Sequence, residues 1–126
     1  MVTEEARLIK EEEVKEEYYT FSESVGTSLT KVVENVIIPQ GYFCPWIEIA
    51  VDNTVSGKID VKVGGKSIFT EPLLTAAFPS NKKPVKIYIP QHLEPTGQKK
   101  MDVYAAGVGG TVTVVGFVRF HFEREG

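Results

Sequence analysis

Residues 110–123 read GTVTVVGFVRFHFE, and apolar side chains recur at every second position of this segment. A β-strand has a side-chain period of two, so one alternate set faces the core and the other faces outward. The core set is Val112, Val114, Gly116, Val118, Phe120 and Phe122. The outward set includes Val115 and Phe117, where a solvated face would carry polar residues. We therefore expect these two side chains to be covered, either by another layer of this chain or by another subunit.

The length and charge of the chain limit its architecture and its partners. Its 126 residues fit one domain that buries a core without disulfides or metal ions. Residues 1–24 carry eight Glu against three Lys or Arg, whereas the remainder has a small excess of positive charge. An acidic segment repels phosphate backbones, so we expect no nucleic acid partner.

The cysteine count bears on cofactors, and the N-terminal residues bear on where the protein is made. A single cysteine, Cys44, excludes an internal disulfide, and no Cys/His spacing is typical of a metal site, so we expect no metal or other cofactor. The first residues are acidic rather than signal-like, and no segment has the roughly 20 apolar residues that span a bilayer. We expect synthesis in the cytoplasm, no secretion signal and no membrane partner. The few Asn, Gln, Cys and Met residues beside many Glu, Lys and Val are typical of thermophile proteins.

The chain divides into an acidic arm, residues 1–17, and a β domain, residues 18–126. Residues 3–17 are mostly helix formers without Gly or Pro, and Thr3 is a candidate N-cap, so we expect a short helix. Apolar residues in this segment sustain no heptad, which argues against a coiled coil. The arm is either solvated or a bridge to a neighbouring subunit, and we expect it to add little to the stability of the β domain.

The β domain shows about eight short strand signals with turn residues between them. They cover residues 18–22, 29–38, 42–52, 57–63, 66–69, 84–89, 99–106 and 110–123. Pro45 lacks a backbone donor, which predicts an edge or a bulge there. Residues 71–80 lose the alternation and predict one helical turn around Leu73 and Leu74. Antiparallel strands without intervening amphipathic helices predict an all-β, two-sheet antiparallel sandwich, most economically a jelly roll.

Candidate catalytic residues are few, and none belongs to a known motif. The histidines, His92 and His121, have no evident nucleophile or metal partner, so we expect both at the surface. Glu48 lies between apolar residues on a strand. It acts either as an acid or base, or, as we expect, in an ion pair with a cation such as Lys31 or Arg119. We therefore predict that the protein is not an enzyme.

Aromatic residues on three strands offer a candidate ligand platform. They are Tyr42, Trp46, Tyr88 and Tyr104. Aromatic faces bind the apolar faces of sugars, but Trp and Tyr are also enriched at subunit interfaces and pack within single chains. All three interpretations stay open for these residues.

The order of strands and turns over residues 29–122 resembles that of small jelly-roll proteins of virus particles. The segments that carry this resemblance are residues 36–42, residues 47–53, the Gly64-Gly65 hairpin, residues 85–90 and residues 110–117. The resemblance implies subunits that pack edge to edge or as trimers, with N-terminal arms that reach their neighbours. Arms that touch a genome are basic, whereas this arm is acidic, so the resemblance implies an outer coat or decorating role.

Taken together, these patterns predict a non-enzymatic structural subunit of a homo-oligomer, as a viral capsid or capsid-decorating protein located in the virion. Its partners would be copies of itself and other virion proteins. We expect the subunit interface to include Val115, Phe117 and Arg119. The alternative is a carbohydrate- or ligand-binding β-sandwich that uses the aromatic platform.

Overall fold

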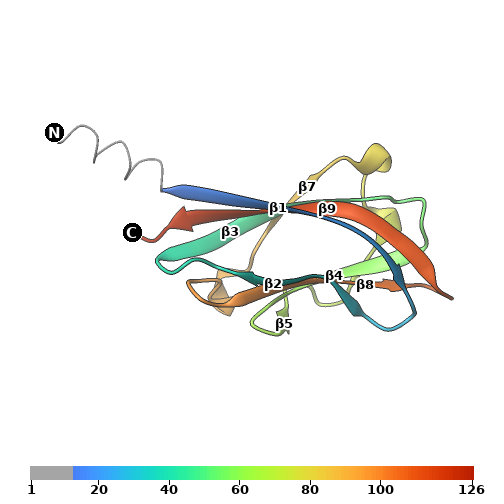
Figure 1. The fold of residues 1–126 in the computed structure, drawn as a ribbon, viewed down its shortest axis with the longest axis horizontal. Coiled ribbons are helices and arrows are strands. Elements are labelled where there is room, and N and C mark those ends of the chain that lie inside the picture. The colour runs from blue at the N-terminus through green and yellow to red at the C-terminus, as the bar shows by residue number, and fades with distance from the viewer. Residues whose placement is uncertain (1–12) are drawn as a thin grey trace.

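The computed structural model describes residues 13–126, which form β-strands joined by turns and three short 3-10 helices (Figure 1). The strands are β1 (Val14–Val25), β2 (Thr30–Ile37), β3 (Tyr42–Val51), β4 (Gly57–Val63), β5 (Lys66–Ser67), β6 (Leu73–Leu74), β7 (Val85–Tyr88), β8 (Lys100–Gly107) and β9 (Val112–Arg124). The 3-10 helices are η1 (Thr75–Ala77), η2 (Ser80–Lys82) and η3 (Gln91–Leu93). In this part of the chain no helix is long and apolar enough to cross a membrane.

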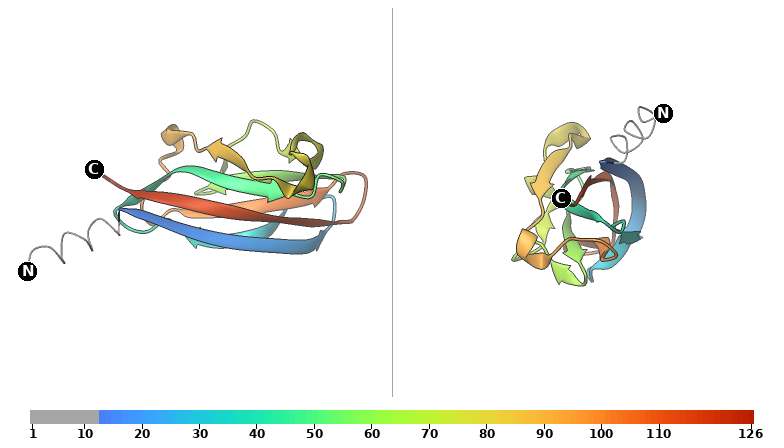
Figure 2. Two further views of the ribbon diagram at one scale, coloured as in Figure 1. Left: turned by 90° about the horizontal axis from the view of Figure 1, so that it is seen from above. Right: turned by 90° about the vertical axis from the view of Figure 1, so that its left-hand side faces the viewer.

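The strands form two antiparallel sheets that pack face to face. One sheet has the order β1-β9-β3-β7, and its strands lie side by side in the view from above (Figure 2). The other has the order β2-β8-β4-β5, with β6 also paired to β4. The structure therefore confirms the all-β, two-sheet antiparallel sandwich. From β1 to β4 and from β7 to β9, consecutive strands alternate between the two sheets, while the jelly-roll topology itself stays a prediction.

Strand β9 organises the first sheet because it pairs with β1 on one side and β3 on the other. Its predicted core face is confirmed: Val114, Val118, Phe120 and Phe122 are fully buried between the sheets. Gly116 belongs to the same face and lies against β3, where an added Cβ would come 2.2 Å from the carbonyl oxygen of Ala50. Glycine is needed here because no side chain fits beside the neighbouring backbone.

The core is aliphatic and aromatic and draws on both sheets. Its largest fully buried side chains include Phe120, Phe122, Ile47, Ile49, Ile59 and Met101. Burial of apolar surface at about 25 cal/mol per Å² makes this layer the main source of stability. The fold thus needs no disulfide, and Cys44 is a free, buried cysteine.

The expected helix over residues 3–17 is wrong at its C-terminal end. Residues 14–17 belong to β1, with Glu16 opposite His121 and Glu17 opposite Phe120 of β9. Pairing with a long strand outweighs the intrinsic helix propensity of Lys and Glu. The rest of the expected helix, including Thr3, lies outside the described residues. Strand β1 therefore crosses the boundary that we expected between residues 17 and 18.

The predicted bulge at Pro45 is confirmed, because the register between β3 and β9 advances three residues on β3 for two on β9 at this point. The bulge exchanges the two faces of the strand. Tyr42 and Cys44, before the bulge, are buried in the core, whereas Trp46 and Glu48, after it, lie on the outer face. These four residues therefore do not share one face, since one extra residue reverses the alternation.

The helical turn expected around Leu73 and Leu74 lies later in the chain. The two leucines form β6 and pair with Lys58 and Ile59 of β4, while the 3-10 turn follows at Thr75–Ala77. The hydroxyl of Thr75 accepts a hydrogen bond from the backbone N–H of Gly57 at 3.1 Å, which fixes the turn against β4.

Candidate functional site

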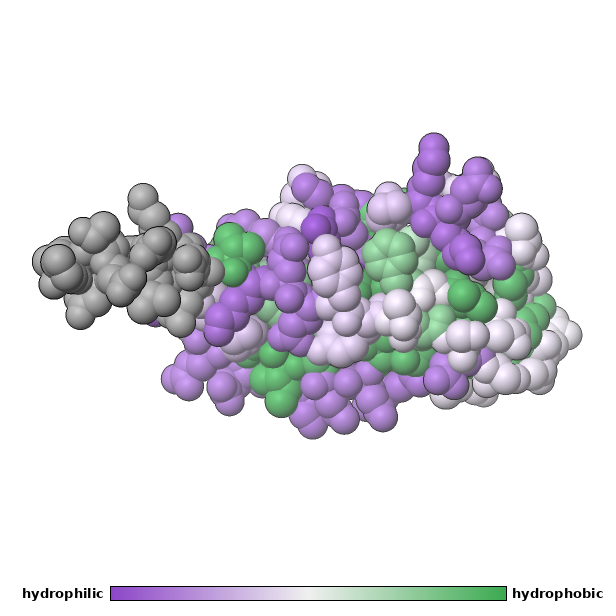
Figure 3. All heavy atoms as spheres, turned by 45° about the horizontal axis from the view of Figure 1, so that its top comes forward, coloured by the Kyte–Doolittle hydropathy of each residue, from purple (hydrophilic) through white to green (hydrophobic). Residues whose placement is uncertain are grey.

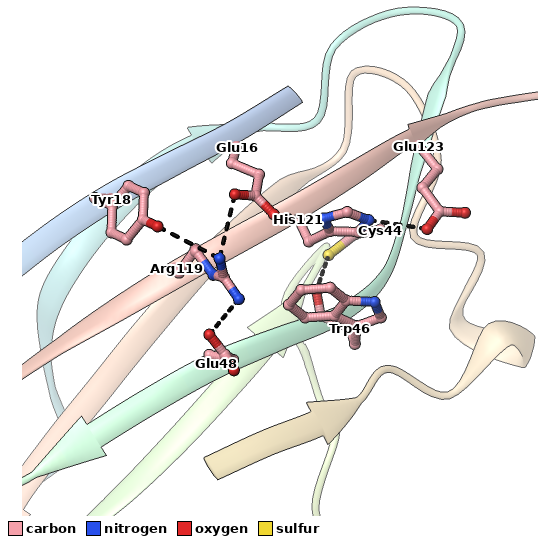
Figure 4. Close-up of polar contacts among 8 residues, drawn as sticks. All are labelled: Glu16, Tyr18, Cys44, Trp46, Glu48, Arg119, His121 and Glu123. Atoms are coloured by element: carbon pink, nitrogen blue, oxygen red, sulfur yellow. Dashed lines mark hydrogen bonds and ion pairs between the residues drawn. The ribbon is translucent and has the colours of Figure 1, made fainter. Parts of the chain in front are cut away.

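The outer face of the β1-β9-β3-β7 sheet carries a dense group of charged and aromatic side chains, here called the outer-face cluster (Figure 4). Its members are Glu16 and Tyr18 of β1, Trp46 and Glu48 of β3, Lys86 of β7, and Arg119, His121 and Glu123 of β9. The strand register places the cluster in rows across the sheet. One row is Glu16, His121 and Trp46, followed by Tyr88 of β7, and the next row is Tyr18, Arg119, Glu48 and Lys86. Directly opposed side chains in such rows interact across the strands.

Arg119 is the centre of the polar contacts in this cluster. Its Nη1 lies 3.3 Å from Glu16 Oε1 and 3.4 Å from the hydroxyl oxygen of Tyr18, and its Nη2 forms an ion pair with Glu48 (Figure 4). Its Nε is buried and has no hydrogen-bond partner among the described residues. The expected ion pair of Glu48 is thus confirmed with Arg119. Lys31, the other candidate, lies on β2 in the opposite sheet.

His121 is held on three sides. Its Nδ1 lies 2.7 Å from Glu16 Oε2, its Nε2 lies 2.8 Å from Glu123 Oε2, and its ring stacks on Trp46 with 4.1 Å between centroids (Figure 4). Only 8% of the residue is exposed, so the expected surface position is wrong for His121. Glu16 of β1 and Trp46 of β3 cover the ring from the two neighbouring strands, and Glu123 covers it from two positions along β9. His92, by contrast, is exposed in η3, as expected.

Two cations surround the indole of Trp46. The Nζ of Lys86 lies 4.2 Å from the ring centroid and the Cζ of Arg119 lies 5.2 Å from it, both within cation–π range. Together with the stacking on His121, these contacts show that Trp46 packs within the chain.

The four aromatic residues of the candidate ligand platform do not come together as one group. Tyr88 lies opposite Trp46 in the register and is 71% exposed. Tyr42 is buried in the core. Tyr104 lies on β8 in the other sheet, where the Nζ of Lys62 is 4.5 Å from its ring centroid.

Val115 and Phe117 continue the outer face beyond the charged rows. Phe117 lies opposite Thr20 of β1, Val115 lies opposite Ser22, and both apolar side chains are half-buried. They line a shallow hollow of about 480 Å³ that also includes Lys82 of η2. The space-filling view toward this sheet shows apolar side chains between polar ones (Figure 3). Arg119, the third residue of the expected interface, is on the same strand face.

Cys44 lies beneath the cluster, in the core. Its Sγ is 3.4 Å from the carbonyl oxygen of Trp46. Burial raises the pKa of the thiol from 9.0 to about 12, against smaller opposing effects of hydrogen bonds with the backbone of His121 and Trp46. Because the thiolate is the reactive form, burial disfavours the reactive state of this cysteine at neutral pH.

The charged groups of the cluster contact one another. Glu48 is neutralised by Arg119, and both ring nitrogens of His121 face carboxylates. Within residues 13–126, no group of three or more His, Cys, Asp or Glu residues could hold a metal ion.

Sequence reasoning missed Glu16, Tyr18 and Lys86 as members of this site. Glu16 was assigned to the expected helix. Its spacing of two residues from Tyr18 was a signal that the strand begins before residue 18. Nothing in the sequence marks Lys86, which joins the cluster because β7 pairs with β3.

No protein-family model matches the chain, and no curated protein matches it. Among solved structures, the chain is similar to the VP2 subviral particle of infectious bursal disease virus, with 10% identity, a TM-score of 0.49 and coverage of 91% of this chain and 33% of that chain. A second VP2 structure, in T=1 particles of the same virus, has 11% identity and a TM-score of 0.43, with 90% and 32% covered. An acetyl xylan esterase from Butyrivibrio proteoclasticus has 15% identity and a TM-score of 0.41, with 88% and 34% covered. The chain thus spans about a third of the length of each of these proteins.

Proposed function

We propose that this chain is a non-enzymatic structural subunit of a homo-oligomer that self-associates through the outer face of the β1-β9-β3-β7 sheet. The observation that carries the proposal is the position of Val115 and Phe117. Both are apolar, half-buried and adjacent on a face that the second sheet does not cover. Contact with another copy would remove this apolar surface from water.

The composition of the surrounding face supports the same proposal. Arg, Trp and Tyr are enriched at protein interfaces and in their energetic hot spots. Tyr18 and Tyr88 are 63% and 71% exposed, on the two outer strands of the sheet. Arg119 is already held by Glu16 and Glu48, so a partner that contacts it would not have to immobilise a free side chain.

A non-enzymatic role agrees with the chemistry of the candidate residues. The carboxylate of Glu48 is engaged by Arg119, His121 lies between two carboxylates, and the thiol of Cys44 is buried. No nucleophile is positioned beside a free base in this cluster, as covalent catalysis would require.

We further propose that the assembly is the coat of a virus particle or a layer that decorates it, so that the protein resides in the virion and contacts other virion proteins. The basis is the sequence resemblance to small jelly-roll virion proteins. The alternation of consecutive strands between the two sheets supports a jelly roll, which is built from two Greek keys. Self-association does not require that the assembly be a virus particle, and it is tested separately.

The test is a double substitution, Val115→Thr with Phe117→Ser, followed by the molar mass in solution from light scattering. We expect the double variant to form smaller species than the parent protein. The matched control is Leu74→Ser with Val108→Ser, which removes two exposed apolar side chains that lie away from this face and should leave the size unchanged. Circular dichroism confirms that both variants are folded. An oligomeric parent whose size survives the first pair of substitutions would contradict the proposal, and loss of glycan binding without a change of size would favour the carbohydrate-binding alternative.

A further inference from the structure

We propose that the open edge of β1 pairs antiparallel with β1 of a second copy, so that two four-stranded sheets become one continuous sheet across a two-fold axis. This interface goes beyond the outer-face contact proposed above, because it uses main-chain groups at the edge of the sheet. Strand β1 is twelve residues long and ends the order β1-β9-β3-β7, so within residues 13–126 only one of its sides is paired (Figure 2). A long edge strand is a template for another strand.

The backbone hydrogen bonds show which groups of β1 point outward. The N–H of Arg124 donates to the carbonyl oxygen of Glu13 at 2.9 Å, and Glu13 precedes β1 in the same register. In an antiparallel ladder, hydrogen-bonded residues alternate with residues whose groups point to the other side. The odd-numbered residues of β1 therefore bond to β9. The even-numbered residues direct their N–H and C=O groups to the open edge, and all of them have exposed side chains: Val14, Glu16, Tyr18, Thr20, Ser22 and Ser24.

A second hydrogen bond independently shows that the even-numbered residues of β1 face the open edge. The carbonyl oxygen of Val115 accepts a hydrogen bond from the N–H of Asp52 at 2.9 Å. The main-chain groups of Val115 therefore point toward the β3 side of β9. Val115 lies opposite Ser22 in the register with β1. Ser22 therefore belongs to a pair that is not hydrogen-bonded to β9, and its own main-chain groups face the open edge.

This edge lacks the protection found on the corresponding edge of the other sheet. Strand β2 has two register shifts against β8, and such bulges discourage pairing with another strand. Strand β1 pairs with β9 without a register shift and contains no proline. Strand β1 does carry charged residues, and these favour one pairing register rather than preventing pairing in every register.

The charges favour a two-fold axis at Tyr19. Outward-facing main-chain groups of the two copies meet only when the pairing register changes in steps of two residues. Such a step moves the two-fold axis by one residue along β1. With the axis at Tyr19, Lys15 of each copy lies opposite Glu23 of the other. Moving the axis to Tyr18 places Glu13 opposite Glu23, and moving it to Thr20 places Glu17 opposite Glu23. Like charges directly opposite one another destabilise a sheet, whereas opposite charges stabilise it.

Pairing in this register would also align the outer faces of the two copies. Tyr18 of one copy would lie opposite Thr20 of the other. Thr20 and Ser22, which line the hollow beside Val115 and Phe117, would lie close to the axis. The edge contact would therefore bring the two apolar patches onto one continuous surface.

The test is disulfide formation between two single-cysteine variants, Tyr18→Cys and Thr20→Cys, under mild oxidation. In the proposed register these two residues form a hydrogen-bonded pair with Cα atoms about 5.5 Å apart, which a disulfide can bridge. Identical positions are offset by two residues and lie about 8 Å apart, beyond that reach. We expect the mixture of the two variants to form at least ten times more cross-linked dimer than either variant alone. Cys44 is buried and stays unreacted in both variants.

Charge reversal provides the second arm of the test. In the cysteine background, Lys15→Glu and Glu23→Lys should each reduce cross-linking several-fold, and the two together should restore it. Lys15 also lies 4.9 Å from the ring centroid of Tyr42, and the restored double variant shows that loss of this contact is not the cause. Equal cross-linking in all samples, or none in the mixture, would overturn the edge pairing. Because these substitutions leave Val115 and Phe117 in place, either interface can fail while the other is confirmed.

Discussion

Glu48 of β3 and Arg119 of β9 lie opposite each other in the sheet and form an ion pair on its outer face. Their side chains are 24% and 22% exposed, so the pair is partly shielded from water. The same guanidinium contacts Glu16 and Tyr18, which connects three strands through one side chain. Removing one partner therefore affects a network rather than an isolated surface pair.

We expect Glu48→Gln to lower the free energy of unfolding by about 1–2 kcal/mol, because Arg119 loses a charged partner but keeps Glu16 and Tyr18. For a domain of this size, the change corresponds to a melting temperature lower by roughly 3–8 °C. Thermal unfolding followed by circular dichroism measures it. Glu34→Gln, at an exposed position on β2, is the matched control and should have no measurable effect. An unchanged melting temperature for Glu48→Gln would show that the network does not stabilise the fold.

Gly116→Ala tests how closely β9 and β3 approach each other. The new methyl group would meet the carbonyl oxygen of Ala50 at 2.2 Å and the ring of Phe21 at 2.8 Å, so the backbone of β3 must shift. We expect a loss of about 1–3 kcal/mol in denaturant unfolding, as for other overpacked cores. Gly110→Ala is the control, because an added Cβ there meets no atom within 4 Å. Equal stability of the two variants would contradict the described packing.

Stability should fall in alkaline solution because of Cys44. In the folded protein its pKa is about 12, whereas an unhindered thiol ionises near 9.0. The stabilisation is complete below pH 9 and is lost as the pH rises toward 12, since the unfolded chain then releases a proton that the folded chain retains. The slope between these two pKa values approaches about 1.4 kcal/mol per pH unit. Tyr19 also makes stability fall above pH 10, because burial and the Glu17 carboxylate raise its pKa to about 12.

Denaturant unfolding of the parent and of Cys44→Ser between pH 8 and pH 11 measures this effect. The variant should show a shallower decline, since the raised pKa of the Cys44 thiol no longer contributes. The slopes are compared rather than the absolute values, because the substitution itself changes core packing. Identical slopes would mean that the thiol is not shielded from water.

The class of the fold could be predicted because side-chain alternation is a local property of the sequence. The core face of β9 and the bounds of β4 follow from it directly. The sequence also indicated the bulge at Pro45, but it did not show that Tyr42 and Cys44 would face the core. A single extra residue reverses every side chain on one side of the bulge.

The composition of the outer-face cluster could be predicted only in part. The ion pair of Glu48 followed from the cost of leaving a carboxylate unpaired on a half-buried strand face. The contact between Glu16 and His121 joins residues 105 positions apart, and it depends on which strand lies beside β9. Helix propensity over residues 3–17 pointed away from that pairing, which only the assembled sheet determines.

The molar mass of the full chain in solution, measured by light scattering over a range of concentrations, tests self-association most directly. The parent protein should have a mass that is a multiple of 14.0 kDa at micromolar concentration. A mass of 14.0 kDa at every concentration, with Val115 and Phe117 accessible to solvent, would contradict the proposal that this sheet face joins copies of the chain.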